Sequence, residues 1–264
     1  MTKIIALTTD FGEGSPYVAA MKGVILSIFP QAKIVDLTHG IPPQNIAHAS
    51  AVLQDVIPFF PPGTLHVVVV DPGVGTNRKI LYAEIGEQAF LFPDNGVLGF
   101  LGNAEEPIQR IIHVQNPKYW RHPVSNTFHG RDIFASVAAH LAAGLDASLL
   151  GEETFHMMRL AAVEPKVSEN RITGMIRYVD SFGNLITNIH HKHLHGRATD
   201  TSVCVIYDIY ETHGIYRTYA DLPEGALIAL VGSGGYLELA VVGSHAARRL
   251  GAEVGQTVTV AWDG

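Results

Sequence analysis

In the first half of the chain, apolar residues alternate between short continuous runs and stretches with helical spacing. Continuous runs bounded by turn residues are typical of buried strands. They predict strands over 4–7, 33–37, 65–70, 80–85, 89–92 and 110–114. Apolar positions three or four residues apart predict helices over 17–29, 45–57 and 131–143. Strands that alternate with helices indicate βαβ units, and therefore an α/β sandwich domain with a mainly parallel sheet.

From about Leu160 the pattern changes to short apolar runs separated by Gly, Pro, Asn and Asp. These runs predict strands over 171–179, 185–189, 201–210, 215–220, 227–231, 237–241 and 256–262. Helical spacing is confined to 244–249. Such a pattern is typical of a small β-barrel or sandwich. We therefore predict two domains, 1–160 and 161–264, with their boundary near Glu164 and Pro165.

Composition and charge narrow the class of protein. With 47% hydrophobic and 16% charged residues the chain is globular. A formal net charge of −7 argues against a nucleic-acid partner. The single cysteine, Cys204, excludes an intrachain disulfide and Cys₄ or Cys₂His₂ zinc sites, and is predicted to be a small apolar filler on a strand. Without a signal peptide pattern or a membrane-spanning run, a cytoplasmic protein with no membrane partner is expected.

Three clusters of polar residues follow predicted strands or open a predicted helix. Asp10 follows the first strand, and Asp71 ends strand 65–70, with Arg78 seven positions further on. Phe128 and His129 lie at the start of helix 131–143. In open α/β sheets, ligands bind outside the carboxyl ends of the strands. Each cluster also has a structural alternative: an N-cap or turn for Asp10, a loop ion pair for Asp71 and Arg78, and a staple and cap for Phe128 and His129.

Two polar segments of the second half have ordinary interpretations. Residues 180–184, Asp-Ser-Phe-Gly-Asn, are rich in turn formers and predict a β-turn. The histidines of 190–195 suggest a metal site, but Lys192 lies among them and no acid is nearby. This segment is therefore predicted to be a solvated loop rather than a metal site.

Several short motifs, spread over nearly the whole chain, are weak individually and specific in combination. They are Thr9-Asp10-Phe11-Gly12, Tyr17-Val18 with Met21-Lys22-Gly23, Val70-Asp71-Pro72-Gly73-Val74-Gly75, Pro93-Asp94-Asn95-Gly96, Thr127-Phe128-His129-Gly130-Arg131-Asp132, residues 180–188 and Gly232-Ser233-Gly234-Gly235-Tyr236-Leu237. In this order and spacing they resemble the S-adenosyl-L-methionine hydroxide adenosyltransferases, relatives of the fluorinase and chlorinase. The resemblance implies an N-terminal α/β domain, a C-terminal β-barrel domain and a homotrimer, with active sites between one subunit's N-terminal domain and a neighbour's C-terminal domain.

The resemblance also implies a chemistry. Asp71, Arg78 and His129 match the hydroxide-forming set, which the halide-using relatives lack. The expected activity is hydrolysis of S-adenosyl-L-methionine to adenosine and L-methionine, by SN2 attack of water or hydroxide at C5′. S-adenosyl-L-methionine is then the substrate, and no metal or other cofactor is expected. A sulfonium makes methionine a good leaving group, so alignment of the nucleophile supplies much of the rate.

Positions for substrate binding follow from the same resemblance. They are Asp10 for the ribose hydroxyls, Phe128 against the sugar, Asp180, Phe182 and Asn184 for methionine and adenine, and Ser233 near the methionine carboxylate. The chain departs from the family pattern at three positions. Ser15 stands where relatives usually have an acid, Gln44 replaces an aromatic residue near the ribose, and Gly234 stands where halide-using relatives have an arginine.

Three other functions compete with the hydrolase. A halogenase would form 5′-chloro-5′-deoxyadenosine in the presence of chloride. A sensor or binding protein would hold S-adenosylmethionine or adenosine without turnover. A metal-dependent phosphoesterase using Asp10, Asp71 and His129 would lose its activity to a chelator.

Overall fold

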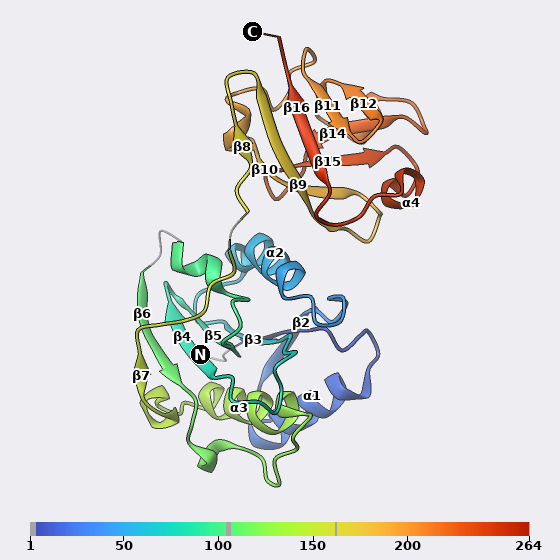
Figure 1. Cartoon of the computed structure of the whole chain (residues 1–264). Helices are drawn as coiled ribbons and strands as arrows, with labels where there is room; N and C mark the ends of the chain where they lie inside the picture. The colour runs from blue at the N-terminus through green and yellow to red at the C-terminus, as the bar shows by residue number, and fades with distance from the viewer. Residues whose placement is uncertain (1–3, 104–106, 162, 264) are drawn as a thin grey trace. The chain divides into compact units, whose positions relative to one another are not determined.

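A seven-stranded sheet forms the centre of the N-terminal part of the chain (Figure 1). The computed structural model describes residues 4–103, 107–161 and 163–263. The strands are β1 (Ile4–Thr9), β2 (Lys33–Thr38), β3 (Leu65–Val69), β4 (Ile80–Ile85), β5 (Gln88–Pro93), β6 (Ile108–His113) and β7 (Glu153–Thr154), in the order β2-β1-β3-β5-β4-β6-β7. Strands β2, β1, β3 and β5 run parallel, whereas β4, β6 and β7 add antiparallel pairs, so the sheet is mixed.

Both faces of this sheet are buried, which explains the continuous apolar runs. Along β3, Val67 packs with residues of α1 (Pro16–Ile28) and α3 (Ser136–Ala142), whereas Val68 packs with residues of α2 (Ile46–Val56). Because successive side chains of a strand point to opposite faces, a strand covered on both sides needs apolar residues at every position. The predicted α/β sandwich is confirmed.

The predicted helix over 131–143 is the one that differs most from expectation. Residues Gly130–Ala135 form a π-helical turn, and the regular helix α3 begins only at Ser136. The first two helices agree with prediction, and their N-caps are Ser15 and Asn45, whose side chains accept hydrogen bonds from the backbone N–H groups of Tyr17 and His48. Turns of this kind are frequent at functional sites.

The C-terminal part of the chain is built from a nine-stranded sheet that curls into a barrel-like shape (Figure 1). Its path is β12-β11-β16-β9-β10-β15-β14-β13, with β8 paired to β9. The elements are β8 (Lys166–Val167), β9 (Arg171–Val179), β10 (Leu185–His190), β11 (Cys204–Tyr207), β12 (Tyr210–His213), β13 (Ile215–Tyr216), β14 (Leu227–Val231), β15 (Tyr236–Val241), α4 (Ala246–Leu250) and β16 (Thr257–Ala261). Strand β12 approaches β14, which nearly closes the sheet. The predicted small β-barrel is thus confirmed as a barrel-like sheet.

Two of the strands predicted for this part are shorter than expected. The run 201–210 contains a two-residue turn at Asp208 and Ile209 that joins β11 to β12. Asp208 has a φ of 50°, a left-handed conformation that Asp tolerates better than most residues. In the run 215–220, strand β13 ends at Tyr216 and a short 3₁₀ turn, Tyr219–Asp221, follows.

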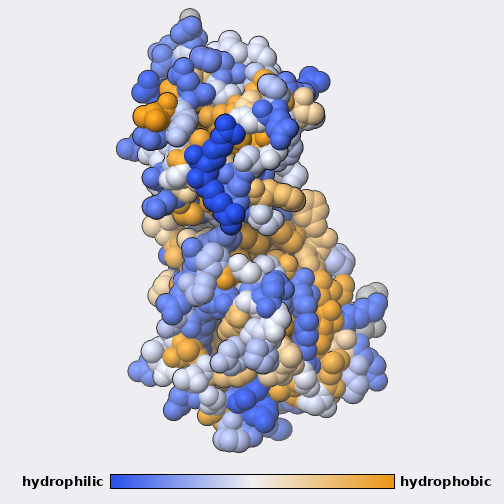
Figure 2. Space-filling model, turned by 90° about the vertical axis from the view of Figure 1, so that its right-hand side faces the viewer, coloured by the Kyte–Doolittle hydropathy of each residue, from blue (hydrophilic) through white to orange (hydrophobic). Residues whose placement is uncertain are grey.

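The chain divides into two compact units, Met1–Ala161 and Ala162–Gly264. Short 3₁₀ turns join the larger elements at Ile57–Phe59, Gly99–Asn103, Pro117–Tyr119, Ala147–Leu150 and His191–Leu194. On the face seen in Figure 2, hydrophilic residues dominate the surface of the C-terminal unit, with scattered hydrophobic residues between them. Among the residues that the structure describes, no helix combines the length and the apolar character needed to cross a bilayer.

Candidate functional site

The loop after β3 brings Arg78 back to Asp71. Asp71 follows the carboxyl end of β3, and the chain then turns tightly, since Val74 N–H donates to Asp71 O and Thr76 N–H donates to Gly73 O. Gly75 has a φ of 78°, and a Cβ at this position would lie 2.4 Å from the backbone oxygen of Asn126. Only glycine fits such a position, so the loop is packed closely against the segment that precedes His129.

Arg78 binds both of the other residues of the predicted catalytic set. Its Nε lies 3.0 and 2.8 Å from the two carboxylate oxygens of Asp71, and its Nη2 lies 2.5 Å from Asp71 Oδ2. The same Nη2 lies 2.9 Å from Nδ1 of His129. The side chains of Asp71 and Arg78 are 4% and 11% exposed, so this is a largely buried ion pair. The structure therefore brings together Asp71, Arg78 and His129, with the guanidinium between the other two.

The contact between Arg78 Nη2 and His129 Nδ1 fixes which ring nitrogen of His129 carries the proton. A guanidinium can only donate, so Nδ1 of the imidazole must accept, and the ring proton of the neutral form lies on Nε2. Burial lowers the pKa of His129, and the positive charge of Arg78 lowers it further. His129 is therefore neutral near pH 7 and presents an N–H donor at Nε2.

His129 is held at the start of the π-helical turn by close packing and by a buried acid. A Cβ on the next residue, Gly130, would lie 3.3 Å from both Phe11 Cζ and Val69 Cγ1, so the turn approaches the sheet closely. Asp132 is fully buried and accepts hydrogen bonds from Arg131 Nε at 2.6 Å and from Ser125 N–H at 2.9 Å. Its interior position fixes the backbone on both sides of His129.

The charge of Asp132 is maintained by these same donors. Burial acts to raise its pKa, but the hydrogen bonds from Arg131, Ser125 and Arg121 outweigh that effect and lower it. Arg121 lies 3.1 Å from the Asp132 carboxylate. Asp132 is therefore an ionised anchor beneath the functional segment, and the sequence offered no signal for this role beyond its place in the motif.

Three aromatic rings lie beside the Asp71–Arg78–His129 set. Ring centroids of Phe11 and Phe128 are 5.8 Å apart, and those of Tyr17 and Phe128 are 5.0 Å apart, in edge-to-face arrangements. The guanidinium of Arg131 lies 5.1 Å from the centroid of Phe128. Tyr17 is 54% exposed, so the cluster presents an aromatic surface to solvent. Such a surface can pack against a sugar or a base.

Asp10 lies at the end of the strand next to β3. Thr9 is in register with Val69, so Asp10 and Asp71 follow the ends of neighbouring parallel strands. Oδ2 of Asp10 accepts a hydrogen bond of 2.7 Å from the backbone N–H of Gln44, which has a φ of 64°. Asp10 is thus not the N-cap of α1, a role taken by Ser15. It positions the loop that contains Gln44 and has a second carboxylate oxygen for a ligand.

A chain of polar contacts beneath Asp10 was not predicted from the sequence. Thr9 Oγ1 lies 3.0 Å from His39 Nδ1, and His39 Nε2 lies 3.1 Å from Asp36 Oδ1. Asp36 is in turn paired with Lys22 at 2.5 Å. The backbone oxygen of His39 accepts from Gly12 N–H. His39 therefore supports the loop that carries Asp10 from both its backbone and its side chain.

In the C-terminal unit, the residues 180–184 form the turn that the sequence predicts. Asp180 Oδ1 accepts from the backbone N–H groups of Phe182 and Asn184, at 2.9 and 2.8 Å, and Oδ2 accepts from the side-chain amide of Asn184 at 3.0 Å. Phe182 is 77% exposed, whereas Asn184 is buried. Ser233 lies exposed in the turn between β14 and β15. The turn is thus a rigid support that presents the ring of Phe182.

Glu238, whose carboxyl group is buried, was not predicted from the sequence as a residue of this region. Glu238 on β15 accepts a hydrogen bond from Tyr219 OH, and the side-chain amide of Asn184 lies 3.5 Å from that hydroxyl. A Cβ at Gly232 would lie 2.4 Å from Glu238 Oε2. Burial raises the pKa of Glu238. Glu238 therefore links the turn of Asn184 to the turn that contains Ser233.

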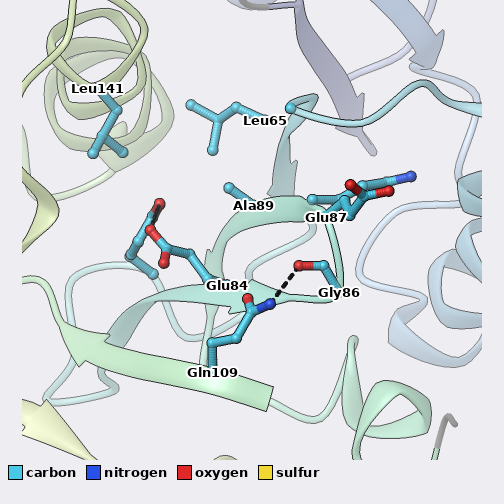
Figure 3. Close-up of a pocket in the computed structure, with 10 residues that line it drawn as sticks. Leu65, Glu84, Gly86, Glu87, Ala89, Gln109 and Leu141 are labelled. Carbon is cyan, nitrogen blue, oxygen red and sulfur yellow. Dashed lines mark hydrogen bonds between the residues drawn. The ribbon is translucent and has the colours of Figure 1, made fainter. Parts of the chain in front are cut away.

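A separate hollow lies at the opposite edge of the N-terminal sheet. It has a volume of about 240 Å³ and lies at the amino end of β3, between Leu65, Glu84, Gln109 and Leu141 (Figure 3). Gln109 Nε2 donates to Gly86 O across its rim. It includes none of the predicted site residues and is therefore not the site described above.

The fold and these contacts define a class of protein. Parallel strands that end at Asp10 and Asp71, an imidazole held neutral by a guanidinium and an aromatic surface are typical of an α/β enzyme that binds a small molecule. Arg78 occupies Nδ1 of His129 and contacts both oxygens of Asp71, so a metal ion bound there would have to displace a guanidinium.

Comparison with known proteins identifies the family. Residues 5–151 match the SAM hydroxide adenosyltransferase N-terminal domain, and residues 174–259 match the SAM hydroxide adenosyltransferase C-terminal domain. The chain belongs to the SAM hydroxide adenosyltransferase family.

Individual relatives extend over nearly the full chain. The (R)-S-adenosyl-L-methionine hydrolase of Thermus thermophilus is 36% identical over 262 residues, which cover 95% of this chain and 96% of the relative. A fluorinase from an Actinoplanes species is 29% identical and covers 97% of each chain. The crystal structure of an uncharacterized conserved protein from Thermotoga maritima has a TM-score of 0.90 at 36% identity, covering 98% of this chain and 99% of that one.

Proposed function

We propose that this protein hydrolyses S-adenosyl-L-methionine to adenosine and L-methionine, without a metal or other cofactor. The observation that carries the proposal is the contact of Arg78 with both Asp71 and His129. Relatives named as hydrolases support it, among them the one from Thermus thermophilus. A halogenase needs room for a halide, and in this chain a carboxylate and an imidazole stand at the positions that, by resemblance, its halide-using relatives leave for that anion.

The proposed reaction is an in-line displacement. A water oxygen forms a bond to C5′ while the C5′–sulfur bond breaks. The electron pair of the broken bond stays on sulfur, which leaves as the neutral thioether of methionine. In the tautomer that Arg78 selects, His129 Nε2–H is a donor, so it orients the attacking oxygen rather than taking its proton. Asp71 is then the proton acceptor, a role worth ~10²–10⁴-fold in rate for a well-placed base. Arg78 stabilises the hydroxide character that develops on the water.

Substrate binding is assigned to both units. Asp10 accepts the ribose hydroxyls and Phe128 packs on the sugar, while Asp180, Phe182 and Asn184 contact methionine and adenine, with Ser233 near the methionine carboxylate. We propose a homotrimer whose sites combine the N-terminal domain of one subunit with the C-terminal domain of its neighbour. The 77% exposure of Phe182 supports this assembly, since an exposed ring is suited to a ligand or partner surface. We also propose a cytoplasmic location, in keeping with a single cysteine.

Chromatography of products tests the proposal. Purified protein is incubated with S-adenosylmethionine in chloride buffer with EDTA, alongside Asp71→Asn. Glu84→Gln is the matched control, because Glu84 is also paired with an arginine, Arg110, at the other edge of the same sheet. Adenosine and methionine from the wild type and the control, but not from Asp71→Asn, are expected.

Three other outcomes would contradict the proposal. Formation of 5′-chloro-5′-deoxyadenosine would indicate the halogenase. Intact substrate that nevertheless binds would indicate a sensor or binding protein. Activity that appears only when EDTA is replaced by a divalent metal would indicate metal-dependent chemistry.

A further inference from the structure

Three metal-ligating side chains lie on one face of the β11–β12 hairpin. Cys204 pairs with His213 across the two strands, and Glu211 lies two residues before His213. Because side chains alternate along a strand, these three lie on the same face, opposite to Val205 and Thr212, which are buried. The sequence predicts Cys204 as an apolar filler, whereas its thiol lies 3.9 Å from a carboxylate oxygen of Glu211.

The spacing of the three ligand atoms is close to that of a zinc site. Cys204 Sγ lies 3.9 Å from Glu211 Oε2, and His213 Nε2 lies 3.6 Å from Glu211 Oε1. All three ligand atoms lie within 4.8 Å of one another. Ordinary zinc bond lengths and a tetrahedral angle require separations of about 3.4–3.6 Å. Glu211 and His213 have side chains that are 61% and 72% exposed, so rotation of these side chains can bring the three ligand atoms from within 4.8 Å to that spacing.

The hairpin itself is well suited to hold this geometry. Strand β11 is paired on its other side with β16, and the two-residue turn at Asp208 and Ile209 fixes the register of β12. Cross-strand neighbours therefore keep their relative positions without help from the metal.

The histidine-rich segment 190–195 does not offer an equivalent site. His190 Nδ1 accepts from Lys192 N–H, and His193 Nδ1 accepts from His190 N–H, so both nitrogens serve to cap the 3₁₀ turn. Among the residues that the structure describes, Cys204, Glu211 and His213 are the group whose ligand atoms converge.

We propose that Cys204, Glu211 and His213 form a zinc site with three protein ligands and a fourth position open to water. Binding replaces the thiol proton, which passes to solvent, with a zinc–sulfur bond, and imidazole and carboxylate complete the protein ligands. A mixed sulfur, nitrogen and oxygen set favours zinc over calcium or magnesium. The site uses no residue assigned to hydrolysis, so it is independent of the proposed function.

Cobalt binding to the purified full-length protein tests the proposal. Cobalt(II) in such a site gives a thiolate-to-metal charge-transfer band and intense tetrahedral d–d bands, which zinc abolishes by displacement. Since the chain has one cysteine, the charge-transfer band reports this site alone, whereas the 14 histidines can bind metal without producing it. We expect one cobalt per chain, loss of the band in Cys204→Ser, and at least about tenfold weaker binding in Glu211→Gln and His213→Gln.

A matched control and a stability measurement complete the test. His191→Gln changes an exposed histidine outside the cluster and should leave the cobalt spectrum unchanged. Zinc should raise the thermal midpoint of the wild type and not of Cys204→Ser, because a ligand that binds the folded state stabilises it. Hydrolytic activity in EDTA should be the same in both. Absence of the band at saturating cobalt, or a band unaffected by Glu211→Gln and His213→Gln, would overturn the proposal.

Discussion

Replacement of Arg78 by lysine tests the role of the guanidinium most directly. Lysine keeps the positive charge but has a single nitrogen in place of a fork. Arg78 contacts Asp71 through Nε and Nη2, and it contacts His129 through Nη2. A single ammonium nitrogen cannot make all of these contacts at once. We expect the relative positions of Asp71 and His129 to be lost.

The magnitude follows from the contacts. Hydrogen bonds to charged groups are worth about 1.5–3 kcal/mol each, and about two are lost. With part of the loss recovered by the ammonium, a net loss of about 1.4–2.7 kcal/mol in the transition state corresponds to about a 10–100-fold lower kcat. KM should change little, since Arg78 is not assigned to substrate binding.

Initial rates of adenosine formation over a range of S-adenosylmethionine concentrations separate kcat from KM. Arg110→Lys is the matched control, because Arg110 also makes a two-point contact with a carboxylate, at 3.0 and 2.8 Å from Glu84, outside the site. An Arg78→Lys enzyme with wild-type kcat, or with a loss no larger than that of Arg110→Lys, would refute the reasoning.

Arg78→Gln gives a second readout, the pH dependence of kcat/KM. The charge of Arg78 adds to burial in lowering the pKa of His129. Without that charge the pKa of His129 rises, so the ring becomes positively charged at a higher pH than in the wild type. It keeps its Nε2–H donor, but its charge then repels the positively charged sulfonium of the substrate and lowers kcat/KM. The acid limb of the profile should therefore move to higher pH, whereas an unchanged limb would show that His129 does not control it.

Three further predictions concern stability, measured by urea unfolding. Gly75→Ala should lower the free energy of unfolding by about 2–4 kcal/mol, and Gly63→Ala by about 1 kcal/mol. Both glycines have a positive φ, but only a Cβ at Gly75 would meet a backbone oxygen. Equal losses in the two variants would contradict the close packing at Gly75. Asp132→Asn should destabilise the protein by about 1.5–3 kcal/mol at pH 7, since it removes the charge of a buried carboxylate that is paired with two partly exposed arginines. Folding lowers the pKa of Asp132, so the stabilisation by its carboxylate is present above the pKa of the unfolded state and is lost as the pH falls through the pKa of the folded state. A stability difference between wild type and Asp132→Asn that does not change with pH down to 2 would contradict this role. Folding raises the pKa of Glu238 above 4.5, so ionisation of this carboxyl group opposes folding as the pH increases. Glu238→Gln, which cannot ionise, should therefore gain stability relative to the wild type toward neutral pH. If the stabilities of the two proteins depend on pH in the same way, Glu238 does not have this role.

Much of the fold was predictable because it is encoded locally. The double-sided burial of β3 is visible as a continuous apolar run, and Ser15 and Asn45 mark the starts of α1 and α2. The two-residue turn at Asp208 was missed because the run around it is rich in strand formers and lacks glycine. The π-helical turn Gly130–Ala135 was missed because the sequence shows only ordinary helical spacing there, and the close approach of Gly130 to the sheet involves residues far away in the chain.

For the candidate site, the sequence predicts residues but not the contacts between them. Motif and strand position predict Asp71, Arg78 and His129, and in the structure Arg78 contacts both of the other two. The support provided by His39 and Glu238 could not be predicted, because it depends on contacts between residues far apart in the chain. A buried polar residue acquires its partner only when the sheet registers are set, and hydrophobic patterning carries no information on that choice.

The position of Arg78 between Asp71 and His129 links the loop after β3 to the π-helical turn. Asp71 and Arg78 belong to one tight loop, and His129 belongs to a segment packed against that loop at Gly75 and Asn126. The contact between the glycine and the backbone oxygen sets the separation of the two segments, and the guanidinium spans it. Asp71 and His129 are therefore not independent groups: displacement of either segment changes the ionic contact of one and the tautomer of the other. A site built in this way depends on backbone packing as much as on its three side chains.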